Sequence, residues 1–116
     1  MTNNQTITIS DEVKKFLKSN HQLLINGEWM PSSSNEKIKV FDPANEQLLT
    51  EVESGNAADI DSAVSAARKA LTGERSKITS HDRARMLDRL ADDIEANFSV
   101  LSEIEVLDNG MPLELA

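Results

Sequence analysis

The spacing of apolar residues changes near residue 55 and divides the chain into two regions. Between residues 23 and 54, apolar residues alternate with polar ones or form runs of two or three between turn signals, as in LLI, IKVF and LLTEV. Such short runs are typical of half-buried strands. Asn26-Gly27 separates two of them and is a strong signal for a hairpin turn. We therefore predict a small antiparallel β region over residues 23–54.

Helical spacing replaces this pattern in residues 55–116. It predicts three amphipathic helices, over about residues 57–71, 79–96 and 98–107. Asn56 and Thr79 are expected to cap the first two, each with an aspartate three residues later. Asn97 is expected to separate the second helix from the third. Asn109-Gly110, followed by Pro112, is expected to end the third.

The apolar faces of these helices are narrow and rich in alanine. Their apolar positions are Ile60, Ala63, Val64, Ala67, Ala70, Leu71, Ala84, Leu87, Leu90, Ala91, Ile94, Leu101, Ile104 and Leu107. Small residues let a helix approach its partner closely, and that partner is either the other helices or a sheet made by sequence outside this chain. We expect the isolated chain to expose apolar surface.

Residues 1–22 are expected to form a polar tail and one short helix. The run SDEVKKFLKS has a capping serine, Ser10, followed by acidic residues and then lysines. Val13, Phe16 and Leu17 lie on one side of this helix, which must dock on other elements because it has barely two turns. The predicted organisation is thus a tail and helix (1–22), an antiparallel β region (23–54) and a helical part (55–116).

Composition and charge exclude several classes of protein. The formal net charge of −8 argues against a general nucleic-acid binder and against docking on an anionic membrane. The absence of cysteine from the 116 residues excludes disulfides, thiolate ligands and a cysteine nucleophile within them. There is no signal peptide and no apolar run long enough to cross a bilayer, so we expect a cytoplasmic protein.

The residues offer little self-contained chemistry. His21 and His81 lack partners at metal-ligand spacing, so both are interpreted as surface histidines. Four acidic residues at positions 88, 92, 93 and 95 could suggest a cation site. A solvated face paired with Arg85 and Arg89 is the better interpretation. The four glycines are isolated, which excludes a dinucleotide or phosphate loop.

Taken in order, however, the segments resemble the N-terminal quarter of NAD(P)-dependent aldehyde dehydrogenases. The resemblance rests on LLINGEW, VFDPANEQLLTEV, AADIDSAVSAARKAL, RARMLDRLADDIEAN and LSEIEVLDNGMPLELA, which together span residues 23–116. The front helix resembles the subgroup that includes phenylacetaldehyde dehydrogenases, which implies an apolar or aromatic aldehyde. We expect the chain to be the front part of a longer enzyme.

The resemblance implies an α/β parent fold with a Rossmann-type coenzyme domain, of which this chain would be an α+β segment. It implies oxidation of an aldehyde to a carboxylic acid with NAD or NADP, through a cysteine thiolate and a glutamate base. Those residues and the main dinucleotide loops would lie beyond this chain, so no catalytic or cofactor-binding residue is assigned here and the chain alone should be inactive. The implied partners are the aldehyde, the remainder of the same fold and further copies in a homo-oligomer.

One site of the family would be partly present. The resemblance implies a monovalent cation, Na⁺ or K⁺, held by backbone carbonyls near the FDP turn and by the aspartate of the LDNG stretch. The matching positions are Val40, Phe41 and Asp108, and hard cations prefer such oxygen ligands. The alternative is that Asp108 only caps or pairs locally near its helix end.

A rival interpretation of the whole chain is a truncated, non-catalytic product that acts as a binding module or has no function. Foldability separates the two, because a sharp, reversible unfolding transition of monomeric residues 1–116 would argue against a fragment.

Overall fold

The computed structural model describes residues 8–116, so most of the expected N-terminal tail lies outside the described residues. The elements are α1 (Asp11–Leu17), β1 (Leu23–Ile25), β2 (Glu28–Met30), β3 (Lys37–Phe41), β4 (Leu48–Glu53), α2 (Ala57–Thr72), η1 (Glu74–Lys77), α3 (Ser80–Ala96), α4 (Phe98–Asn109) and η2 (Leu113–Leu115). The predicted α+β order, with a short helix, then strands, then three long helices, is confirmed.

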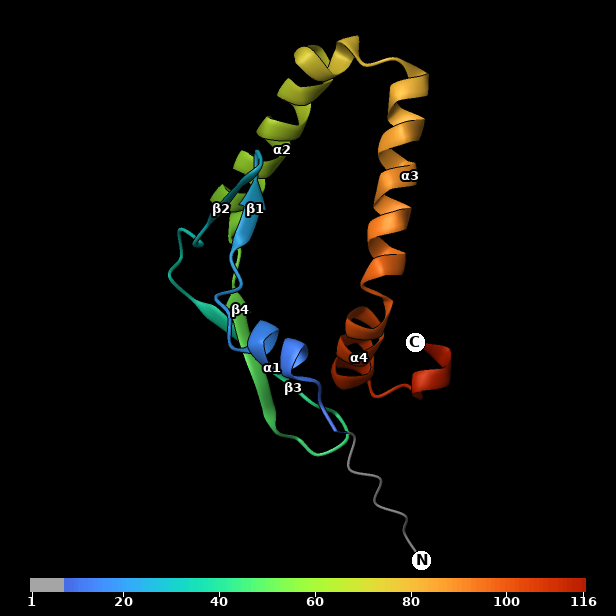
Figure 1. Ribbon diagram of the computed structural model, residues 1–116. Helices are drawn as coiled ribbons and strands as arrows, with labels where there is room; N and C mark the ends of the chain where they lie inside the picture. The colour runs from blue at the N-terminus through green and yellow to red at the C-terminus, as the bar shows by residue number, and fades with distance from the viewer. Residues whose placement is uncertain (1–7) are drawn as a thin grey trace, which may run out of the picture.

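The elements form a base and an arch (Figure 1). The base consists of α1, β3, β4 and α4, with α1 packed against α4. The arch consists of α2, η1 and α3, and its two long helices stand apart from each other above the base. The β1–β2 hairpin contacts α2. The base therefore brings together α1 and α4, which lie near opposite ends of the described chain.

The β region forms two separate two-stranded antiparallel sheets, β1–β2 and β3–β4. Asn26 and Gly27 join β1 to β2 with φ angles of 56° and 81°, as a tight two-residue hairpin turn requires. Pro31, directly after β2, has no N–H to continue a ladder, and the next five residues form a loop before β3 begins. The sequence predicted antiparallel pairing correctly but not this division.

The predicted helix boundaries agree with the structure. The Ser10 side chain accepts from the Val13 N–H at the start of α1, and Asn56 forms a complete capping box with Asp59 at the start of α2. Thr79 caps α3, as predicted. Asn97 is the junction between α3 and α4, and α4 ends at a left-handed Gly110. Local sequence signals thus determine where each helix starts and stops.

The hydrophobic core is small and lies mostly in the base. Its buried apolar residues are Val13, Ile25, Val106 and Leu107. The chain exposes 9513 Å², whereas a compact protein of this mass exposes about 6,300 Å². Its radius of gyration is 18.1 Å, against about 13 Å for a compact chain of this length. This is an open structure with few contacts between distant elements.

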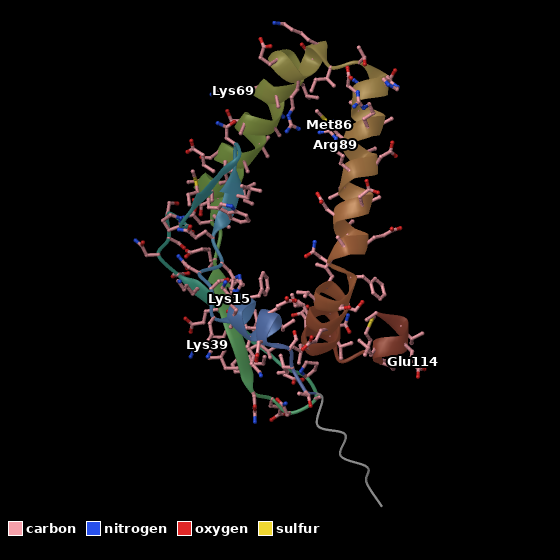
Figure 2. The ribbon with its side chains drawn as sticks, viewed as in Figure 1. Lys15, Lys39, Lys69, Met86, Arg89 and Glu114 are labelled. Carbon is pink, nitrogen blue, oxygen red and sulfur yellow. The ribbon has the colours of Figure 1, made fainter. Side chains whose placement is uncertain are left out.

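The apolar faces of the arch are exposed, as expected for helices without their partner. Leu71 on α2 is 76% exposed and Leu87 on α3 is 66% exposed. Figure 2 shows Met86 and Arg89 projecting from the side of α3 that faces α2, and Met86 is half exposed there. On the apolar face of α4, Leu101 is also half exposed, whereas Leu107 is buried. No helix among residues 8–116 is both long and apolar enough to cross a membrane.

Candidate cation site

The turn that follows β3 is organised by Asp42. Its buried carboxylate accepts from the Ala44 N–H at 2.8 Å and from the Asn45 side-chain amide at 2.9 Å. Its own N–H donates to the Gln47 carbonyl at 2.9 Å. This is the local bonding that makes aspartate a turn residue, and the hydrogen bonds fix the backbone just after Phe41.

The end of α4 lies directly against this turn. Gly110 has a φ of 75°, and a Cβ built on it would lie 3.0 Å from Cγ of Pro43. A glycine is therefore required here both by backbone conformation and by space. The contact places the FDP turn and the LDNG stretch side by side, although they are far apart in the sequence.

A cavity of about 220 Å³ lies beside this contact, between α1, β3, β4 and α4. Val40 and Asp108 both line it. Phe41 is half exposed and is not among its lining residues. The structure therefore brings two of the three predicted cation ligands to one cavity, and the third is next to them at the irregularity in the β3–β4 pairing.

The available donors limit the kind of ion that this place could hold. Residues 8–116 contain no group of three or more His, Cys, Asp or Glu side chains arranged to hold a metal ion. A cation held by the predicted ligands would depend on the backbone carbonyls of Val40 and Phe41 and on the Asp108 carboxylate, and Glu105 is the other acidic residue that lines the cavity. Such oxygen donors suit a hard monovalent ion rather than a transition metal. The assignment of Val40, Phe41 and Asp108 as ligands stays a prediction.

The two histidines lie in different surroundings. His81 is exposed on α3, as predicted. His21 is only partly exposed, and its ring lies 4.8 Å from that of Phe16. Its Nε2 atom is buried without a hydrogen-bond partner. The prediction of a surface histidine is therefore wrong for His21, because α1 folds back over it.

The acidic side of α3 is solvated but is not ion-paired. Its four acidic residues are all exposed. The described part of the chain contains three ion pairs, Lys14–Asp11, Lys37–Glu53 and Lys77–Glu74, and none of them lies on α3. The predicted pairing with Arg85 and Arg89 is wrong, since exposed pairs gain little over hydration.

A buried polar network that the sequence did not reveal joins the loop after β2 to β4 and α2. Ser32 is 2% exposed, its N–H donates to Glu53 Oε2 at 2.9 Å, and its hydroxyl lies 2.6 Å from Asp59 Oδ2. The Asp59 carboxylate also accepts from the backbone N–H groups of Ser33 and Asn56. The only sequence signals were the Asn56–Asp59 capping box and a proline before three serines, and neither indicates burial of Ser32.

These hydrogen bonds stabilise the charged form of Asp59. The Ser32 hydroxyl makes the largest contribution and the Asn56 N–H follows, and together they hold the pKa of Asp59 well below its ordinary value. Asp59 is therefore ionised at neutral pH and serves as the polar centre of the joint between β4 and α2.

Comparison with known proteins agrees with the resemblance seen in the sequence. The model of the aldehyde dehydrogenase family matches residues 29–116. Aldehyde dehydrogenase 1A1 of Gallus gallus is 43% identical over 91 residues, which cover 77% of this chain and 18% of that protein. The putative aldehyde dehydrogenase DhaS of Bacillus subtilis is 35% identical over 109 residues, covering 93% of this chain and 22% of that protein.

The fold also matches solved structures. The NAD⁺ complex of aldehyde dehydrogenase from Bacillus cereus superposes with a TM-score of 0.89 at 34% identity, covering 94% of this chain and 22% of that one. The chain thus spans about a fifth of the length of these relatives. Because the family model covers most of the described residues in one continuous stretch, this chain belongs to the aldehyde dehydrogenase family.

Proposed function

We propose that this chain is the N-terminal part of an enzyme that oxidises an aldehyde to a carboxylic acid with NAD or NADP. The observation that carries the proposal is the continuous family match over residues 29–116. The similarity in fold to a family member solved with NAD⁺ supports a nicotinamide coenzyme. The resemblance of the front helix to the phenylacetaldehyde dehydrogenase subgroup favours an apolar or aromatic aldehyde.

The chemistry requires residues that this chain lacks. Oxidation through a thioester needs a thiolate nucleophile and a base that activates water, and the 116 residues contain no cysteine. The coenzyme would accept the hydride when bound, and no residue of this chain is assigned to its binding. We therefore propose that residues 1–116 alone are inactive.

The role of this segment is structural support for the rest of the enzyme. The exposed apolar faces of α2 and α3 have the spacing of helices that pack on a sheet. We propose that they cover the coenzyme-binding sheet formed by later sequence. The base would hold Na⁺ or K⁺ at the carbonyls of Val40 and Phe41 and at Asp108, and the assembled enzyme would be a cytoplasmic homo-oligomer.

The test begins with the intact protein from its source cells. Its mass is measured first, and the protein is then assayed with aromatic and short aliphatic aldehydes, following the absorbance of the reduced coenzyme with NAD⁺ and NADP⁺ in turn. We expect a mass several-fold above 12.8 kDa and turnover by the intact protein only. A native mass equal to that of this chain, or turnover by residues 1–116 alone, would contradict the proposal.

A further inference from the structure

The chain contains two asparagine-glycine pairs, Asn26-Gly27 and Asn109-Gly110. Such a pair is chemically labile, because glycine has no side chain to hinder attack by its own backbone nitrogen on the preceding asparagine side chain. Both asparagines are exposed, so access of water does not distinguish the two pairs. The structure distinguishes them by how firmly each pair is held.

Asn109-Gly110 is held by three hydrogen bonds at the end of α4. The Asn109 side-chain amide donates to Glu105 Oε1 at 2.7 Å, and its Oδ1 accepts from the Met111 N–H at 2.8 Å. The Gly110 N–H donates to the Val106 carbonyl at 2.9 Å. The nitrogen that would attack and the amide that it would attack are therefore both occupied.

Asn26-Gly27 lacks these restraints. Among residues 8–116, neither the Asn26 side chain nor the Gly27 N–H takes part in a hydrogen bond, and nothing lies within 4 Å of a Cβ built on Gly27. The strands on either side, β1 and β2, are three residues long each, and a two-stranded hairpin by itself is marginally stable in water. This turn therefore opens at lower cost than the end of α4, and its opening lets the Gly27 nitrogen approach Asn26 Cγ.

We propose that Asn26 is a site of spontaneous covalent modification, through a cyclic imide formed with Gly27. The Gly27 nitrogen bonds to Asn26 Cγ and loses its proton, the bond from Cγ to the side-chain nitrogen breaks, and ammonia leaves with that proton. Water then opens the imide and returns a proton to the Gly27 nitrogen. Opening at the side-chain carbonyl yields aspartate, and opening at the main-chain carbonyl yields isoaspartate, whose backbone contains one additional methylene.

Isoaspartate changes the hairpin as well as its charge. A two-residue turn sets the register of its strands, so an added methylene disrupts the Ile25–Glu28 pairing that closes this hairpin. Ile25 is buried, and β1 contacts α2, along which the hairpin lies (Figure 1). Modification of Asn26 therefore adds a negative charge and loosens the hairpin from α2. The inference does not depend on the proposed dehydrogenase activity.

Ageing of the complete protein tests the site. The folded protein is incubated in mildly alkaline buffer and digested. Conversion of both asparagine-glycine peptides is followed by mass spectrometry, and isoaspartate is detected by methyl transfer from an isoaspartyl carboxyl methyltransferase. Each rate is divided by the rate at the same site in protein unfolded with urea, which removes the effect of neighbouring sequence.

Each hydrogen bond that must break lowers the open population about 2- to 10-fold. With three such bonds at Asn109, we expect the normalised rate at Asn26 to be at least about 10-fold higher, with isoaspartate among its products. Equal normalised rates at the two sites would overturn the proposal. So would the absence of conversion at Asn26 in folded protein during the time in which unfolded protein converts.

Two variants test the cause of the difference. Glu105→Ala removes one of the three hydrogen bonds and should raise the rate at Asn109 about 2- to 10-fold, without changing the rate at Asn26. Glu95→Ala, which removes an exposed carboxylate from α3, should change neither rate. An unchanged rate at Asn109 in Glu105→Ala would contradict protection by hydrogen bonding. If Glu105→Ala fails to fold, the comparison of the two wild-type sites remains decisive.

Discussion

Gly110 is the residue on which the contact between α4 and the β3–β4 turn depends. Gly110→Ala should lower the free energy of unfolding for two reasons. A side chain in the left-handed region costs about 1–2 kcal/mol, and the new Cβ would meet Pro43 at 3.0 Å, which adds about 1 kcal/mol of overpacking. Thermal or urea unfolding of the intact protein measures the loss.

Gly27 supplies the matched control, because its φ is 81° but nothing lies within 4 Å of an added Cβ. Gly27→Ala should therefore lower the free energy of unfolding only by the cost of placing a side chain in the left-handed region. If the two variants lose the same stability, the close packing of Gly110 on Pro43 contributes nothing.

Asp59 should make stability depend on pH in the acid range. Its pKa is lowered in the folded protein, so its contribution is complete above its unfolded pKa of about 3.9 and decreases as the pH falls towards the folded value. Asp59→Asn should thus be less stable than the wild type at neutral pH, with the difference shrinking below about pH 4. Unfolding midpoints measured from pH 7 to pH 2 follow this change.

The control for this titration is Asp61→Asn, an exposed aspartate two residues later in the same helix. It should leave the pH profile close to that of the wild type. A constant difference between wild type and Asp59→Asn down to pH 2 would show that the hydrogen bonds do not favour the charged carboxylate.

Individual site residues could be predicted only as far as local signals or the family resemblance reached. Val40 and Asp108 were placed together by resemblance, and the structure brings both to one cavity. The burial of Ser32 could not be predicted, since a serine in a polar run has the signature of a loop. Its surroundings come from Glu53 and Asp59, which lie 21 and 27 residues away.

At the scale of elements, helix caps are the features most open to a direct test. The Thr79 side chain accepts from the Asp82 N–H at 3.1 Å and is exposed, so it has no packing role. Thr79→Ala should lower the free energy of unfolding by about 1 kcal/mol, as removal of an N-cap side chain typically does. Amide hydrogen exchange should show the loss first in the opening turn of α3.

Ser80→Ala, one position further along, provides the comparison, because Ser80 is exposed and is the first residue within the helix. This substitution should change the free energy of unfolding by no more than about 0.5 kcal/mol, as ordinary surface substitutions do. An equal loss in both variants would mean that the helix start is not set by the Thr79 side chain.

Helices were predicted well because their signals are local. Asn56, Thr79, Asn97 and Gly110 act within a few residues of their own positions, so periodicity and capping rules suffice. The division of the β region into two sheets depends instead on which strands meet, which no short window of sequence contains.

At the scale of the whole molecule, the exposed faces of the arch should have opposite effects in the two forms of the protein. Leu87→Ser with Leu90→Ser removes apolar surface from α3, where these residues are 66% and 53% exposed. In isolated residues 1–116 the double variant should bind less of a hydrophobic dye and remain soluble to higher concentration. In the complete enzyme it should reduce stability by several kcal/mol, because buried leucines contribute about 2–5 kcal/mol each.

Asp92→Ser on the same helix is the polar control. It should change neither the dye binding and solubility of isolated residues 1–116 nor the stability of the complete protein. Unchanged stability of the complete enzyme with the double variant would mean that α3 remains exposed there. The proposed packing of the arch on later sequence would then be wrong.

The packing contact between Pro43 and Gly110 also determines the order in which tertiary contacts form during synthesis. Ser10 N–H meets Glu103 Oε1 across 93 residues at the same base, so neither contact can form until α4 has been made. While the ribosome adds α2 and α3, α4 is not yet present to contact the β3–β4 turn. For that interval the leucines of the nascent chain are exposed to solvent, which is the condition under which chaperones bind.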